Sequence, residues 1–91
     1  MKAGERGVRA VSNLFDLPKE ATLGLPRIII LGHEEMLIEN HCGIVEYSPE
    51  IITVATKSGS TSVTGGGLLL KSIDTERIHI TGKIITILFE L

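Results

Sequence analysis

The chain has 91 residues, a formal net charge of −2 at pH 7, a hydrophobic fraction of 43% and an aromatic fraction of only 3%. This length fits one domain, and neither the charge nor the scarce aromatic side chains suit a nucleic-acid-binding surface. One cysteine excludes an intrachain disulfide, and no apolar run approaches the roughly 18 residues of a membrane-spanning helix. We therefore expect a small domain with a core of Ile, Leu and Val and no transmembrane segment.

Residues 1–26 are predicted to form an N-terminal arm that precedes an all-β domain of residues 27–91. Apolar side chains recur at helical spacing in this arm, at Val8, Val11, Leu14 and Phe15, which predicts a short amphipathic helix. This face would dock on the protein itself, on a partner or on a membrane surface. Asp16 and Pro18 fit the start of a second short helical segment, and Pro26 ends the arm in extended geometry.

Short apolar runs then alternate with glycine, proline and small polar residues, at a spacing typical of an all-β domain. Eight strands are predicted, over Ile28–Leu31, Met36–Glu39, Ile44–Tyr47, Ile51–Thr56, Ser60–Thr64, Leu68–Lys71, Ile78–Ile80 and Ile84–Phe89. The expected fold is mainly β, a meander in a small sandwich or roll, with a short β-solenoid as the alternative because Gly-containing units recur.

The last two predicted strands form a hairpin around Gly82, a residue that tolerates a positive φ. The final run is apolar on both faces, which predicts a strand that is covered on both sides. In the preceding strand His79 alternates with isoleucines and should face solvent or an interface. Three consecutive glycines, Gly65 to Gly67, precede a strand rather than a helix, so they indicate a turn or bulge and not a phosphate-binding loop.

His33, His41 and Cys42 are the candidate metal ligands, and His41 with Cys42 is also the candidate nucleophile pair. A catalytic cysteine needs its histidine across a cleft rather than beside it in sequence, and a zinc site needs more ligands at characteristic spacings. A turn with Cys42 tucked in as a small hydrophobic side chain is the favoured interpretation. No catalytic residue and no cofactor are predicted. The many apolar strands leave edges that favour a binding or structural protein over an enzyme.

Several stretches point to one known family. They are Asp16-Leu17-Pro18-Lys19-Glu20, Leu25-Pro26-Arg27-Ile28, Ile38-Glu39-Asn40-His41 with Gly43-Ile44, and Ile78-His79-Ile80-Thr81-Gly82-Lys83-Ile84. From Leu14 to Leu91 the chain resembles the YabP/YqfC family of sporulation proteins, in particular its YqfC branch. It departs from the family pattern at the three glycines that begin at Gly65, where a single glycine is expected.

The resemblance implies a protein of an endospore-forming, Firmicutes-type bacterium that acts in the mother-cell cytoplasm, without known enzymatic activity and beside a membrane protein of the YqfD type. Glu39, Asn40, His41 and Gly43 mark the family and become the candidate interface. From the residues alone, Asn40 and Gly43 shape a turn. Two alternatives stay open: a self-assembling structural β protein, which would be a homo-oligomer, and a metal- or ligand-binding module that uses His33, His41 and Cys42.

Overall fold

The computed structural model describes residues 23–91, which form one open antiparallel sheet of six strands. The strands are β1 (Arg27–Leu31), β2 (Glu35–Glu39), β3 (His41–Tyr47), β4 (Ile51–Thr56), β5 (Gly59–Ile73) and β6 (Arg77–Glu90). Their order across the sheet is β1-β2-β6-β5-β4-β3. The prediction of a mainly β protein is confirmed. No helix occurs in residues 23–91, and the predicted N-terminal helical segments lie outside this range.

The strand count of eight is wrong, because two predicted breaks fall inside long strands. The predicted strands on either side of Gly65 to Gly67 are both parts of β5, and those on either side of Gly82 are both parts of β6. The hairpin therefore turns not at Gly82 but between β5 and β6, near Asp74. A stacked-strand solenoid does not describe this sheet, because all its neighbouring strands are antiparallel.

Glycines let β5 and β6 bend together. The β5–β6 ladder shifts register between Thr64 and Gly65 and again between Gly66 and Leu69, which are β-bulges. A Cβ atom on Gly65 would lie 1.8 Å from the carbonyl oxygen of Lys83, and one on Gly82 would lie 2.5 Å from that of Gly67. Gly82 also has a φ of 125°. These glycines therefore allow a close backbone approach that no other residue permits.

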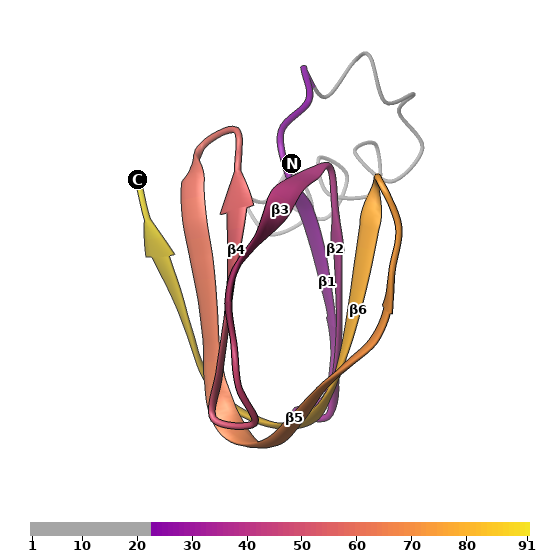
Figure 1. Cartoon of the computed structure of the whole chain (residues 1–91), viewed down its shortest axis with the longest axis vertical. Coiled ribbons are helices and arrows are strands. Elements are labelled where there is room, and N and C mark those ends of the chain that lie inside the picture. The colour runs from indigo at the N-terminus through magenta and orange to yellow at the C-terminus, as the bar shows by residue number, and fades with distance from the viewer. Residues whose placement is uncertain (1–22) are drawn as a thin grey trace, which may run out of the picture.

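The bend folds the sheet into a U, with β5 and β6 running through its base (Figure 1). Below, residues 77–81 are called the inner half of β6 and residues 84–90 its outer half. The inner half lies between β2 and β5 on one arm of the U, whereas the outer half continues on the other arm beside β5. The topology is thus a meander of β3 to β6 with the β1–β2 hairpin added next to β6, and not one continuous meander.

The core fills the space between the two arms. It consists of nine buried aliphatic side chains: Met36, Ile38, Ile52, Val54, Val63, Leu68, Ile78, Ile80 and Ile84. Within residues 23–91 the outer half of β6 is not covered on both faces as predicted, since Ile85 is 63%, Leu88 55% and Phe89 56% exposed. Apolar sequence alone does not bury a strand, because burial depends on which elements lie over it.

Candidate functional site

The predicted Glu39-Asn40-His41 element lies at the open end of the U, where β2 passes to β3. Asn40 is the single residue between these strands, with a φ of 62°, a left-handed conformation that Asn adopts more readily than most residues. Its backbone N–H donates to the carbonyl oxygen of Glu76 at 2.8 Å, and its Nδ2 donates to that of Leu25 at 2.9 Å. The predicted break of four residues, 40–43, is therefore too long, because β3 already begins at His41.

Both ring nitrogens of His41 have a defined role. Nε2 lies 2.8 Å from the carbonyl oxygen of Asp74, and Nδ1 accepts the backbone N–H of Gly43 at 3.0 Å. A carbonyl oxygen can only accept, so Nε2 donates the first of these hydrogen bonds and Nδ1 accepts the second. Gly43, with a φ of 118°, places its N–H for this bond.

The Asp74 carboxylate holds the turn that His41 contacts. Asp74 Oδ1 accepts the backbone N–H groups of Glu76 at 2.8 Å and of Arg77 at 2.7 Å. These two hydrogen bonds, with a smaller contribution from the Arg77 charge, hold the pKa of Asp74 below its ordinary value of 3.8. We call Asn40, His41 and Asp74 the latch, since they tie the β2–β3 link to the β5–β6 turn. The latch uses its polar groups inside the molecule, and its role as an interface stays a prediction.

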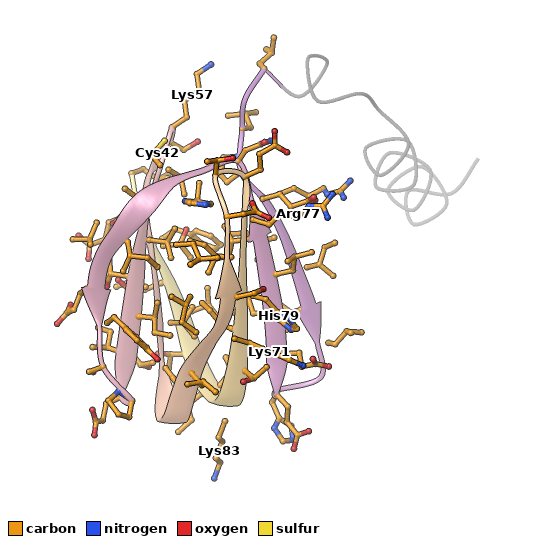
Figure 2. The ribbon with its side chains drawn as sticks, turned by 45° about the vertical axis from the view of Figure 1, so that its right-hand side comes forward. Cys42, Lys57, Lys71, Arg77, His79 and Lys83 are labelled. Carbon is orange, nitrogen blue, oxygen red and sulfur yellow. The ribbon has the colours of Figure 1, made fainter. Side chains whose placement is uncertain are left out.

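Glu39 faces outward from β2 between two arginines. The register places Arg27 of β1 and Arg77 of β6 directly opposite Glu39 on its two sides. Its Oε1 binds the Arg27 Nε, and its Oε2 lies 3.1 Å from the Arg77 Nε. The side chain of Glu39 is only 15% exposed, whereas that of Arg77 is 61% exposed. Glu39 thus joins three strands through charge pairs, while Arg77 still reaches solvent (Figure 2).

The three candidate metal ligands do not come together. His33 lies in the turn between β1 and β2, at the end of β2 opposite to His41 and Cys42. Cys42 is exposed rather than tucked in, and Figure 2 shows it at the end of the molecule opposite to Lys83. Within residues 23–91 no group of three His, Cys, Asp or Glu side chains could hold a metal ion. The predicted docking face of Val8, Val11, Leu14 and Phe15 lies outside the described residues.

A shallow hollow lies on the outer face of β1, β2 and the inner half of β6, just beyond the Glu39 charge pairs. Ile29, Leu37 and His79 occupy the same row across these strands, and Leu31, Glu35 and Thr81 occupy the next. The hollow measures about 260 Å³ and is lined by Ile29, Leu31, Glu35, Met36, Leu37 and His79. Its polar border is the contact between His79 Nε2 and Glu35 Oε1 at 3.2 Å. We call this surface the outer hollow.

The outer hollow was not predicted as a site from the sequence. The expectation that His79 faces outward is confirmed, since it is half-buried and bound to Glu35. The other lining residues were missed, although a signal exists: β1 is apolar at four consecutive positions after Arg27, which is more than a strand with one buried face requires.

Comparisons with known proteins give one consistent result. The model of the family described as the YabP family matches residues 24–90. The protein named "Uncharacterized protein YqfC" of Bacillus subtilis (strain 168) is 28% identical to this chain over 74 residues, which cover 81% of this chain and 80% of that protein. No solved structure matches. In the described part of the chain there is no helix long and apolar enough to cross a membrane.

Proposed function

The chain belongs to the YabP family, and from this premise we propose that it is a non-enzymatic binding factor of endospore formation. It works in the mother-cell cytoplasm, at the surface of a membrane, and its partner is the cytoplasmic part of a membrane protein of the YqfD type. Family membership is consistent with a role related to sporulation. The outer hollow is the observation that carries the binding role.

The outer hollow has the composition of a recognition surface. Its floor and rim are aliphatic, and Leu31 at the rim is 66% exposed. Ile29 and Leu37 are half-buried and lie side by side in the sheet, so an apolar side chain inserted above them would bury area on both. Protein interfaces commonly combine such an apolar centre with a polar border that fixes orientation.

The charges beside the outer hollow suggest the chemistry of the partner. Arg77 shares Glu39 with Arg27, so two guanidinium groups lie around one carboxylate. The Arg77 guanidinium, on a side chain that is 61% exposed, suits an acidic residue of the partner. The segment that fits is therefore apolar, with an acidic residue next to the side chain that enters the outer hollow.

The side chains of the outer hollow support binding over catalysis. Its titratable groups, Glu35 and His79, already contact each other, and the lining contains no Ser, Cys or Lys that could act as a nucleophile. The pair fits a polar border that a partner's hydrogen bonds extend, because each group keeps part of its surface exposed: 45% for Glu35 and 28% for His79.

Co-purification of the tagged full chain from sporulating cells tests the proposal. Leu31→Asp should lose the membrane partner, because it places a charge at the rim beside the apolar floor. Val45→Asp is the matched control, since Val45 on β3 is exposed to the same extent, 65% against 66%, and lies away from the outer hollow. Circular dichroism establishes that both variants are folded.

Equal recovery of the partner by Leu31→Asp and by wild type would exclude the outer hollow as the contact. The double variant Asn40→Ala/His41→Ala tests, in the same experiment, the hypothesis that the family motif is the interface. Because the polar groups of the latch form hydrogen bonds within the chain, we expect a lower thermal midpoint of unfolding in this variant. Loss of the partner at an unchanged midpoint would instead place the contact at the latch.

A further inference from the structure

We propose that the outer half of β6 pairs with the same segment of a second copy of this chain, so that the protein forms an antiparallel two-fold dimer through a continuous sheet. This contact uses the arm of the U that does not carry the outer hollow, and it is independent of the proposed partner binding. Three features of the outer half carry the inference: an unpaired edge, exposed apolar side chains, and opposite charges at its two ends.

The edge is unpaired because β2 ends too early. β2 accompanies the inner half of β6 as far as the pair Glu35–Thr81. Two more backbone bonds follow beyond it, from Gly82 N–H to the Glu34 oxygen at 3.1 Å and from Ile84 N–H to the His33 oxygen at 2.7 Å. From Ile85 onward, no strand within residues 23–91 lies on that side of β6. Such an edge is a template for another strand.

The outer half is also apolar, and beyond the bulge at Ile85 it is regular. Its ladder with β5 runs without a bulge from Ser60–Glu90 to Thr64–Thr86. Ile87 lies opposite the buried Val63, so Ile85, Ile87 and Phe89 share the face that continues the core. Ile85 and Phe89 are more than half exposed, unlike Ile78 and Ile80 of the inner half, which are fully buried. A second copy at this edge would extend the core across the dimer axis.

Other edges of the sheet carry features that discourage pairing. β3 shifts register twice against β4, so its outer edge is irregular. The end of β5 beyond Leu69 also contains a register shift and bears Lys71, and its Leu70 N–H already donates to the Tyr47 hydroxyl at 3.2 Å. β1 spans only five residues. Short, bulged or charged edges resist association, whereas the outer half of β6 has no charged residue between Lys83 and Glu90 and no register shift from Thr86 to Glu90.

The charges at the two ends of the outer half select a second copy in antiparallel orientation. Lys83 precedes the apolar run and Glu90 ends it, and both side chains are exposed. Antiparallel pairing around a two-fold axis brings Lys83 of each copy toward Glu90 of the other, whereas parallel pairing would bring like charges together. A two-fold axis perpendicular to the sheet also keeps the core-facing isoleucines of both copies on one face.

Charge reversal in the full chain tests the proposal by sedimentation over a range of concentrations. Wild type should show a monomer–dimer equilibrium. Lys83→Glu alone and Glu90→Lys alone should each raise the dissociation constant roughly tenfold, because two attractive pairs become repulsive. The double variant Lys83→Glu/Glu90→Lys should restore it, and the two single variants should form a heterodimer when mixed.

Lys71→Glu is the control, since it makes the same charge change at the end of β5 that pairs with the inner half of β6, and it should leave the dissociation constant unchanged. A wild type that stays monomeric at all concentrations would overturn the proposal, as would assemblies larger than a dimer. Equal effects of Lys71→Glu and Lys83→Glu, or a double variant as weak as the single ones, would also overturn it. Circular dichroism on each variant separates loss of pairing from loss of the fold.

Discussion

The two halves of β6 have similar amino-acid compositions but opposite environments. Both are rich in isoleucine, yet Ile78 and Ile80 are fully buried whereas Ile85 is 63% exposed. The inner half has a strand on each side, β2 and β5, and the other arm of the U lies over its core face. The outer half has β5 on one side only. Both halves are therefore apolar enough to form a core, but only the half that other strands surround is buried.

The residue between the two halves explains how one strand can have both environments. At Gly82 the strand turns around the backbone of Gly67, and at the facing position Gly65 approaches Lys83. The bend sends the outer half to the second arm, beyond the reach of β2. One continuous strand thus completes the core with its inner half and presents an unpaired edge with its outer half.

The bend itself should be the most sensitive point of the fold. Gly65→Val should abolish cooperative folding, because its Cβ would lie 1.8 Å from the Lys83 oxygen, which belongs to the backbone and cannot rotate away. Gly66→Val is the matched control: a Cβ there meets nothing within 4 Å, so its free energy of unfolding should change by about 0.5 kcal/mol or less. Urea denaturation followed by circular dichroism measures both, and similar losses would show that the bend tolerates a side chain.

The next largest change in the free energy of unfolding is expected from the difference in burial between the two halves of β6. Ile80→Ala should lower the free energy of unfolding by about 2–5 kcal/mol, because it removes fully buried methyl groups and leaves a cavity. Ile85→Ala should lower it by about 0.5 kcal/mol or less in protein dilute enough to be monomeric. A loss at Ile85 as large as that at Ile80 would mean that the outer half of β6 is covered within a single chain.

Three of the four strands before residue 57 could be predicted to within one residue, because alternating polarity and turn residues mark their ends: Ile51–Thr56 coincides with β4. The exception is β3, which begins at His41 and not at the predicted Ile44. The breaks at Gly65 to Gly67 and at Gly82 were misplaced, because glycine marks a turn and a close backbone approach equally well. Whether a glycine marks a turn or a close backbone approach depends on the strand that lies opposite, and this is set by the tertiary structure. The outer hollow was missed for the same reason, since it exists only through the register of three strands.

Substitutions in the latch should lower the free energy of unfolding less than substitutions in the core, because the latch fixes only the point at which the inner half of β6 begins. Asn40→Ala should lower the free energy of unfolding by about 1–2 kcal/mol, since alanine disfavours the left-handed conformation and cannot bond the Leu25 oxygen. Asn40→Gly keeps the backbone conformation and loses only the side-chain bond, so it should cost less. Chemical denaturation of both measures the difference, and equal losses would assign the whole effect to the side chain.

The smallest effect on stability is expected at Asp74, whose stabilisation of the β5–β6 turn depends on pH. Its pKa is lowered in the folded chain, chiefly by the Glu76 and Arg77 backbone N–H groups, so the unfolded chain takes up the proton first as pH falls. The stabilisation is therefore complete above the ordinary value of 3.8 and is lost as pH drops through the lower folded value. Asp74→Asn keeps an oxygen that can accept both bonds but does not titrate. The free energies of the two proteins should differ most near neutral pH and converge in acid.

Salt separates the two causes of the lowered Asp74 pKa. Hydrogen bonds from backbone N–H groups keep their strength in salt, whereas the Arg77 charge is screened over about 3 Å at 1 M ionic strength. The convergence in acid should therefore persist in about 1 M sodium chloride, with only its smaller Coulombic part removed. If salt abolished the convergence, the charge of Arg77 would be the main cause, and the turn that starts the inner half of β6 would rest on an ion pair rather than on its own backbone.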